Sequence, residues 1–490
     1  MAGLRAAAEL PRLGRGAQPP GGGLLGGRRR RGRRHRHPRV RRPAHRLLVP
    51  LRAQHHRQEG PAVTAHLLPR SISTATSAVI GATSIAPLYS VVVTLGLMHA
   101  LVGRWTPVVL VAAVVPMAVV SVCFARLDEL YEDQGTVYRW AREAYGAFVG
   151  FLGGWGLWLS ATLVLASLAW VTADSALFVL GAEPGPWVVT AVAAALMAVF
   201  AAISSTGIRV SAAVQAVFAA LQLAGVGVLV WATRTAPVVE GAAEGGGEWS
   251  GFYTAALAGG ELTAGNVAAA LLLALFLYWG WDSTFSLTEE STTQRAPRVS
   301  AWIALTVVAA VYAVIGWSYV PGASVGSPLL AGLVAVSAAA SIGTTMIPTS
   351  RGLMSMARGG HLPRRFLSLS FATWTTAAVA AAWMTFSGPL FDDTVGVISV
   401  LVALYYGLAC AATAKLARTT GARLLGAAGA ALMAVALVLT GLEYVLSAAW
   451  VWAGAVLVLL VVPLWFLLGR GRAPLPGAHE RAPHLESLRN

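Results

Sequence analysis

Eleven uncharged stretches constrain this chain more than any other feature, because they divide nearly everything from Ser71 to Gly469 into bilayer-length segments. A bilayer core takes about 20 apolar residues per helix, and in lipid each segment must satisfy its own backbone hydrogen bonds. The longest stretch, 299–350, predicts two helices with a turn near Pro321 and Gly322. Twelve membrane-spanning helices are therefore expected. The stretches are 71–103, 105–125, 144–173, 184–208, 210–233, 262–281, 299–350, 366–391, 394–414, 424–442 and 444–469.

The positive charge of the chain belongs to a tail and not to its body. The sequence is 56% hydrophobic and only 12% charged, which is far from the composition of a soluble domain. Residues 1–70 hold 17 of the 36 basic side chains and two acidic ones, whereas the remaining 420 residues carry 19 of each. The body is therefore neutral, and no nucleic-acid partner is expected for it.

Three regions follow from this division. Residues 1–70 are rich in Arg, Gly and Pro and contain no aromatic side chain, so disorder is predicted. This tail either contacts anionic lipid or RNA, or reflects an over-long gene start, with translation beginning nearer Val63. Residues 71–470 form the expected twelve-helix domain, and residues 471–490 form a C-terminal tail.

The loop charges predict an orientation. With the N-terminus inside, the cytoplasmic loops and the proximal C-terminus hold 15 basic residues, and the outer loops hold only Arg104 and Arg234. This is a strong positive-inside bias. It predicts an integral protein of a bacterial cytoplasmic membrane with both termini in the cytoplasm.

Two predicted spans are interrupted, and their positions correspond. In the first, Pro87 follows a run of small polar residues, and a proline inside a helix is expected to kink or break it. In the sixth, Gly280 lies among large aromatic residues and is followed by Asp282. Paired interrupted helices in two halves of a chain point to the central site of a transporter. Asp282 either serves that site or lies hydrated at the inner end of the helix.

Three blocks of sequence carry a resemblance to a known family. Residues 133–140, followed by 150–155, are similar to its small-Gly-x-x-Tyr-x-Trp and Gly-Phe-Leu-x-Gly-Trp elements. Residues 278–282 with Glu289 and Glu290 resemble its aromatic-Gly-aromatic-Asp and Glu-Glu block, and residues 350–363 resemble the inner end of its eighth helix. The chain therefore resembles an amino acid permease of the amino acid–polyamine–organocation superfamily.

The resemblance implies an all-α fold of two inverted five-helix repeats plus two peripheral helices, with broken helices 1 and 6. It implies that substrate binds between these two helices. The carboxylate of an amino acid would meet backbone N–H groups of helix 1, and its ammonium would meet carbonyl groups of helix 6. The candidate substrate-binding residues are Ala82, Thr83, Ser84, Ile85, Tyr278, Trp279, Gly280, Trp281 and Asp282.

Two further sets of candidates surround that site. In helix 8, Ser341, Thr344 and Thr345 form a wall or contribute to a sodium site, although such hydroxyls more often bond to their own helix. Glu289 and Glu290 either pair with arginines of the inner face in a gate or are solvated loop charges. The candidate arginines are Arg295, Arg351 and Arg358.

The departures from the family pattern concern the pocket and the coupling ion. Ala82-Thr83-Ser84 stands where members often have Gly-Ser-Gly, and the extra side chains narrow the pocket or change which backbone groups are free. Gln222 stands in the neighbourhood where some proton-coupled relatives carry a lysine. No cofactor is expected other than a coupling ion, either H⁺ or Na⁺, and no metal site is predicted.

Other classes of function fit the sequence less well. A membrane enzyme needs clustered His, Asp or Glu inside its spans, and His99 is the only histidine within the uncharged stretches. No repeated filter loop of a channel is present. Two alternatives on the same fold stay open, a polyamine or amine permease and a transport-inactive sensor. The sequence does not determine the transported molecule, the coupling ion, whether transport is uptake or exchange, or the oligomeric state.

Overall fold

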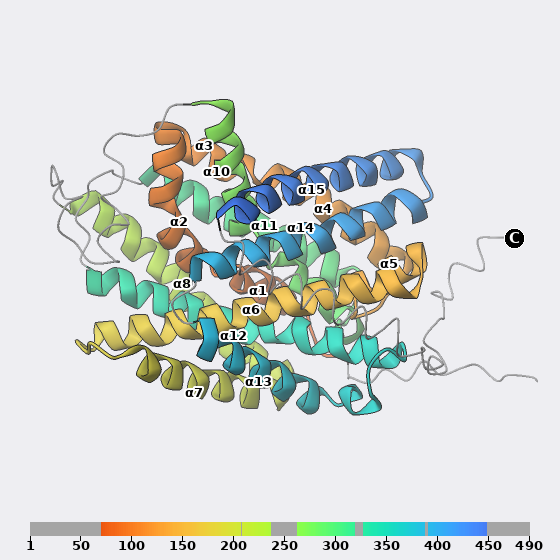
Figure 1. The fold of residues 1–490 in the computed structure, drawn as a ribbon, viewed down its shortest axis with the longest axis horizontal. Helices are drawn as coiled ribbons and strands as arrows, with labels where there is room; N and C mark the ends of the chain where they lie inside the picture. The colour runs from red at the N-terminus through yellow and green to blue at the C-terminus, as the bar shows by residue number, and fades with distance from the viewer. Residues whose placement is uncertain (1–69, 207, 237–261, 319–326, 388–390, 448–490) are drawn as a thin grey trace, which may run out of the picture. The chain divides into compact units, whose positions relative to one another are not determined.

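The computed structural model describes residues 70–206, 208–236, 262–318, 327–387 and 391–447 (Figure 1). This part of the chain is almost entirely helical, and nine of its helical stretches are long and apolar enough to cross a membrane. No sheet occurs in the described ranges; their one β-bridge joins Ile72 to Ser291. The predicted all-α membrane fold is confirmed. The basic tail and most of the twelfth predicted span, 444–469, lie outside the described residues.

The predicted spans and the observed helices correspond in order. The first five spans are α1 (Thr74–Ser84) with α2 (Pro87–Val102), α3 (Thr106–Ala112) with α4 (Val114–Leu130), α6 (Ala147–Val179), α7 (Pro186–Ser205) and α8 (Ile208–Thr235). The second five are α10 (Ala264–Leu277) with the 3₁₀ helix η3 (Trp281–Glu290), α11 (Ala296–Ser318), α12 (Ser327–Arg358), α13 (Leu369–Ser387) and α14 (Phe391–Leu416). The stretch 299–350 does hold two helices, and α15 (Thr420–Ser447) follows the second set.

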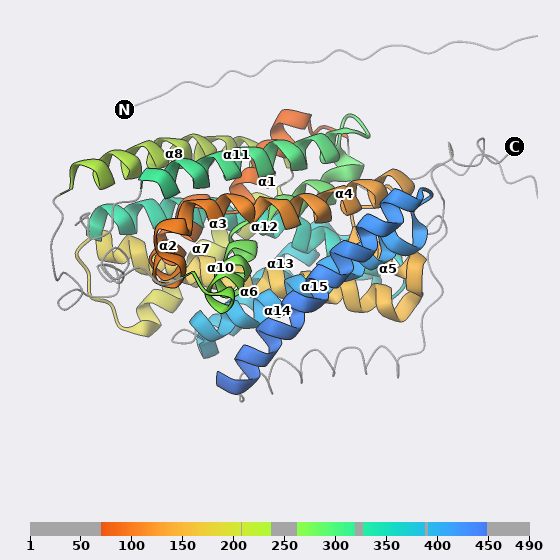
Figure 2. The same cartoon turned by 90° about the horizontal axis from the view of Figure 1, so that it is seen from above.

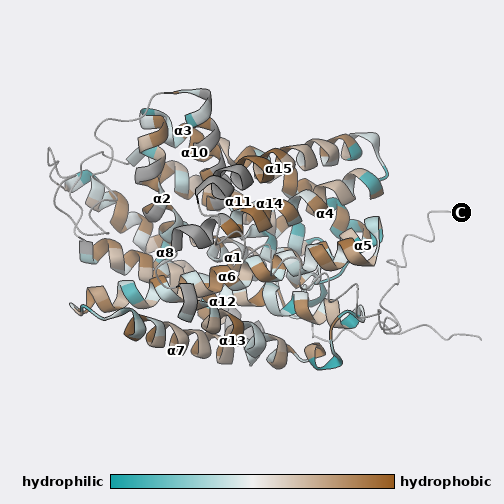
Figure 3. Cartoon of the chain, viewed as in Figure 1, coloured by the Kyte–Doolittle hydropathy of each residue, from teal (hydrophilic) through white to brown (hydrophobic). Residues whose placement is uncertain are grey.

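Hydropathy follows the pattern of a membrane bundle. Apolar residues cover the helices, and hydrophilic residues gather mainly at helix ends and connections (Figure 3). Several large apolar side chains point outward from α7, α8 and α15, among them Trp187, Val217, Trp231 and Leu424. Such exposure is unfavourable in water and neutral in lipid.

Glycines allow the closest helix contacts. The amphipathic helix α5 (Val137–Tyr145) packs against the first turns of α6, and α6 packs along α12. A Cβ atom added at Gly154 would lie 2.7 Å from the Cβ atom of Tyr138, so the two backbones approach more closely than side chains permit. Elsewhere α1, α8 and α11 contact one another, with α8 and α11 side by side (Figure 2).

The two cysteines, Cys123 of α4 and Cys410 of α14, are both buried and free. The two helices meet there, because the hydroxyl group of Thr413 donates to the carbonyl oxygen of Cys123 over 3.2 Å. These thiols serve as small buried groups of the core.

Candidate functional site

The first interruption lies where the sequence places it. Helix α1 ends at Ser84, and α2 begins at Pro87. Between them Ala86 adopts a left-handed conformation, with φ 50° and ψ 57°. A residue before proline is disfavoured in the right-handed helical region, and Pro87 has no N–H to continue the ladder of hydrogen bonds. Ala82, Thr83 and Ser84 therefore form the last turn of α1, whereas Ile85 lies in the break.

The second interruption separates α10 from η3. Tyr278, Trp279 and Gly280 connect the two segments, and Gly280 has a φ of 120°. A side chain is strongly disfavoured at this φ, so glycine supplies the turn. Trp281 and Asp282 then open η3.

The two interruptions cross in direct backbone contact. A Cβ atom at Gly280 would lie 2.8 Å from the carbonyl oxygen of Ser84 and 3.1 Å from the nitrogen atom of Ile85. Only a residue without a side chain allows this approach. The Ser84 carbonyl also accepts a hydrogen bond of 2.7 Å from the Ser341 hydroxyl group of α12. The crossing therefore joins both broken helices to α12.

A buried carboxylate lies beside the crossing. Asp282 is 8% exposed, and the Tyr405 hydroxyl group of α14 donates to its Oδ2 atom over 3.0 Å. The indole N–H of Trp279 donates in turn to the Tyr405 oxygen. Among the described residues no ion pair includes Asp282. A carboxylate buried without a cation is strongly disfavoured unless it is protonated or meets a positive ligand.

Several polar atoms around the crossing are buried without a hydrogen-bond partner among the described residues. They are Ser84 Oγ, Tyr278 OH, Trp281 Nε1 and Ser283 Oγ. Buried polar groups are hydrogen-bonded in most proteins, and a group that is not needs an explanation. Similar atoms occur elsewhere in the described helices, but these four lie on the two interrupted helices and could meet a polar ligand there.

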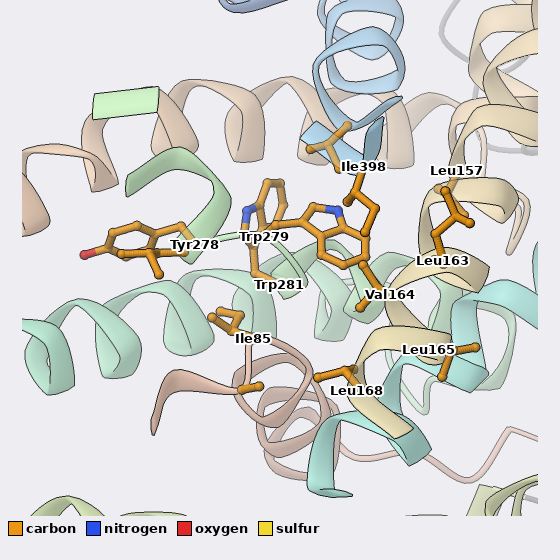
Figure 4. Close-up of a cluster of buried hydrophobic side chains, with 14 of the residues drawn as sticks. Ile85, Leu157, Leu163, Val164, Leu165, Leu168, Tyr278, Trp279, Trp281 and Ile398 are labelled. Atoms are coloured by element: carbon orange, nitrogen blue, oxygen red, sulfur yellow. The ribbon is translucent and has the colours of Figure 1, made fainter. Parts of the chain in front are cut away.

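Apolar side chains from other spans border the same region. Figure 4 shows Trp279 and Trp281 close together, with Tyr278 pointing away from them. Val164 of α6 and Ile398 of α14 lie beside the indoles and are buried. Polar backbone at the crossing and an apolar wall opposite it suit a zwitterion that carries an apolar group.

The three candidates of predicted helix 8, which is α12 in the structure, differ in what their hydroxyl groups contact. Ser341 reaches the crossing, whereas the Thr344 hydroxyl group donates within its own helix, to Ser341 O over 3.2 Å and Ala340 O over 3.4 Å. Thr345 accepts at its carbonyl oxygen from the Thr349 hydroxyl group over 2.5 Å. The role of Thr344 and Thr345 in binding Na⁺ stays a prediction.

Comparison with known families agrees with this geometry. A family model described as amino acid permease matches residues 70–472, which is most of the chain. The chain belongs to the amino acid permease family. No match to a curated protein accompanies it. The permease is therefore an integral membrane transporter in general function, and the resemblance seen in the sequence is confirmed.

Paired charges close one end of the permease, here named the charged end. Glu289 of η3 makes a two-pronged contact with Arg358 of α12, with oxygen–nitrogen distances of 2.7 and 3.0 Å. Next to it, Glu290 pairs with Arg351 at 2.5 Å, and both side chains are almost fully buried. The third predicted partner, Arg295, takes part in none of the ion pairs found in the described ranges.

The N-terminal segment also binds at the charged end of the permease. The backbone N–H groups of Ser71 and Ile72 donate to the Glu290 carbonyl oxygen over 2.8 and 2.9 Å, and Thr292 N–H donates to Ile72 O over 2.9 Å. The side chain of Ile72 packs with Ile80, Leu287 and Ile347 in a separate buried cluster. The segment before α1 and the end of η3 are thus linked, and these are the halves of the two broken helices at the charged end.

An aromatic layer separates the crossing from the ion pairs. Phe124 of α4 contacts Trp281 edge-on, with ring centroids 5.4 Å apart, and Trp140 of α5 at 4.9 Å. Phe285 and Tyr406 complete the layer. All five rings are buried, so the side chains of this layer are packed away from solvent.

Several residues of this end are not among those predicted from the sequence. Arg298 pairs with Asp128 at 3.3 Å and with Glu129 at 2.9 Å, and Asp133 accepts from the Ser355 hydroxyl group at 2.8 Å. These contacts join α4 to α11, and the loop after α4 to α12, which are far apart in the chain. The clustering of charge at helix ends was the only signal available.

A tyrosine–histidine pair joins α5 to the segment after α12. Arg142 donates to the Tyr138 oxygen over 3.0 Å, so the Tyr138 hydroxyl group donates to Nδ1 of His361 over 2.6 Å. Burial, with the nearby Arg142, lowers the pKa of His361 to about 4. Burial raises the pKa of Tyr138 to about 12. His361 is therefore neutral and Tyr138 protonated near neutral pH.

Proposed function

We propose that this permease is a secondary active transporter that carries amino acids across a bacterial cytoplasmic membrane by alternating access. The observation that supports the proposal best is the backbone contact of Gly280 with Ser84 and Ile85, because it brings both interrupted helices to one point. Half-helix N-termini favour a carboxylate, and half-helix C-termini favour a cation. A zwitterion matches both.

The start of α2 offers the groups for the carboxylate. Pro87 begins the helix, and the next N–H groups belong to its first turn, where no preceding carbonyl lies within the helix. One of them, Tyr89 N–H, already donates to the Ser337 hydroxyl group over 3.1 Å. The carboxylate is proposed to bind at the break next to Ile85, before this turn.

The end of α10 offers the groups for the ammonium. Carbonyl oxygens of its last turn have no partner further along an α-helix, although that of Leu277 accepts from the Tyr312 hydroxyl group over 2.6 Å. Carbonyls at Tyr278 and Trp279 are the proposed acceptors. The paired charges and aromatic layer at the charged end are proposed to open when substrate leaves to the cytoplasm.

An amine permease is the second candidate, and Asp282 is the observation that favours it. In this alternative the carboxylate meets the positive charge of the substrate directly. In the amino acid carrier, the Asp282 carboxylate instead takes up a proton, which makes transport proton-coupled. The amino acid carrier could instead be coupled to Na⁺ bound at α12, or could exchange substrates without a coupling ion.

Counterflow in proteoliposomes tests these candidates. Vesicles loaded with an unlabelled amino acid are expected to accumulate the labelled compound, and a sensor on the same fold gives no accumulation with any amino acid or amine. Asp282→Asn then separates the carriers. It is expected to abolish amine uptake in an amine permease, and to abolish proton-driven accumulation while sparing counterflow in a proton-coupled amino acid carrier. Glu183→Gln, a charge change in the exposed segment between α6 and α7, is the control.

A further inference from the structure

A cavity lies beside helix α1. Its volume is about 360 Å³, and its walls come from α1, α2, α8 and α11. None of the described residues that line it belongs to α10 or η3. It is thus apart from the backbone groups proposed to bind substrate at Ile85, Tyr278 and Trp279, although Ala82 and Thr83, two of the candidate substrate-binding residues, form part of its wall.

The wall of this cavity is almost purely hydrocarbon. Apart from Thr83 and Gln222, every lining residue is Ala, Val, Leu, Ile or Pro. The Thr83 hydroxyl group is engaged within its own helix, donating to Val79 O over 2.8 Å. The oxygen of Gln222, a residue 3% exposed, accepts from the Ser337 hydroxyl group over 3.1 Å. The amide nitrogen of Gln222 is the one side-chain polar atom of the lining residues that is buried without a partner among the described residues. Water needs two to four polar partners to occupy a cavity, so a single donor is too few and the cavity suits an apolar occupant.

The cavity opens sideways. Leu223 of α8 and Ile303 and Val307 of α11 stand at its wall and are 59%, 42% and 39% exposed. These helices are apolar enough to cross a membrane. In the membrane, their exposed apolar side chains face the acyl chains of the bilayer and not water. Hydrocarbon from the bilayer therefore has a direct route into the cavity.

We propose that this cavity binds an acyl chain of a membrane phospholipid, which enters between α8 and α11 and packs against the back of the break in helix 1. An apolar wall without a neighbour loses its dispersion contacts, and the inserted chain restores them. The bound chain contacts Ala82 and Pro87 and so resists displacement of α1 toward α8. The site thereby links lipid occupancy to movement of a broken helix, independently of which substrate is carried.

Photo-crosslinking of the full-length protein tests the proposal. The chain is reconstituted in nanodiscs that contain a phospholipid with a diazirine in the middle of one acyl chain, and labelled residues are mapped by mass spectrometry. Labelling is expected to concentrate on 75–83, 219–226 and 303–311. It should exceed, several-fold, the labelling of Val217 and Trp231, which are exposed elsewhere on α8. Uniform labelling of all exposed apolar residues overturns the proposal.

A matched pair of variants sharpens the test. Ala219→Trp places an indole in the cavity, whereas Val217→Trp places the same group on the outer surface of α8, where Val217 is 61% exposed. The first variant is expected to lose labelling on α1 and α11, and the second to keep it. Unchanged labelling in Ala219→Trp contradicts the proposal, as does labelling by a free fatty acid but not by phospholipid. If the Ala219→Trp variant does not fold, the distribution of labelled residues in the wild-type protein tests the proposal on its own.

Discussion

At the scale of single residues, Gly280 limits how closely the broken helices approach. Its φ of 120° and its distance from Ser84 both exclude a side chain. Gly280→Ala is expected to destabilise the protein by roughly 1–3 kcal/mol through backbone strain alone, and to abolish substrate binding because the crossing must widen. Thermal unfolding and ligand-induced stabilisation of the purified variant measure both effects.

Gly227→Ala is the matched control for this substitution. Gly227 lies in α8, and a Cβ atom there has no neighbour within 4 Å. Alanine is favoured over glycine inside a helix by roughly 1 kcal/mol, so this variant should be as stable as the wild type or slightly more so. Equal behaviour of the two variants would contradict the role given to Gly280.

His361 gives the protein a stability that depends on pH. Its pKa is lowered to about 4 from an ordinary 6.5, so the unfolded chain binds the proton more readily than the folded one. Stability is therefore complete above about pH 6.5 and falls as the pH drops from 6.5 to 4. Protonation removes the acceptor for Tyr138 and places a second positive charge beside Arg142.

His361→Gln is expected to reduce this loss of stability on acidification. The melting temperature of wild type and variant, followed between pH 4 and 7 in one detergent, measures it. Transport near neutral pH should keep the same pH profile in both proteins, since His361 is neutral there. A wild-type melting temperature that the variant reproduces at every pH would show that His361 does not contribute.

At the scale of elements, the ion pairs join η3 to α12. Removing one partner of a buried pair leaves the other charge uncompensated and costs about 3–5 kcal/mol. Because the Arg358 side chain is 22% exposed, removing it should reduce the free energy of unfolding by an amount at or below the low end of this range. Arg358→Met is expected to destabilise the protein more than the double variant Glu289→Gln with Arg358→Met.

An exposed pair supplies the comparison. Arg126 and Glu129 are 53% and 39% exposed, and such pairs contribute about 0–1 kcal/mol. Arg126→Met should therefore change the thermal unfolding little. If it destabilises as much as Arg358→Met, the buried pair has no special part in closing the charged end.

The positions of helices could be predicted from the sequence, and most of their side-chain contacts could not. The uncharged stretches predict the spans, and Pro87 and Gly280 predict both interruptions, because lipid and backbone geometry act locally. Tyr405 lies far from Asp282 in sequence, and nothing near either residue indicates their hydrogen bond. Likewise Arg295 and Arg298 are equivalent by sequence, yet only Arg298 forms ion pairs among the described residues.

At the scale of the whole molecule, the charge distribution predicts which end faces the cytoplasm. Arg365 lies in η4 (Arg364–Leu367) at the charged end, and Glu183 lies between α6 and α7 at the other. Both residues are exposed. In a background with Cys123 and Cys410 replaced by serine, Glu183→Cys should react with an impermeant maleimide on intact cells, and Arg365→Cys only after permeabilisation. The reverse pattern would invert the proposed orientation.

The most direct test is an experimental map of the protein in lipid nanodiscs, recorded with a saturating amino acid that stabilises it and again without it. Added density is expected between the break at Ile85 and the turn at Tyr278–Gly280, with the carboxylate toward the start of α2. Density at any other place, or regular helix running through both interruptions when the amino acid is bound, would contradict it.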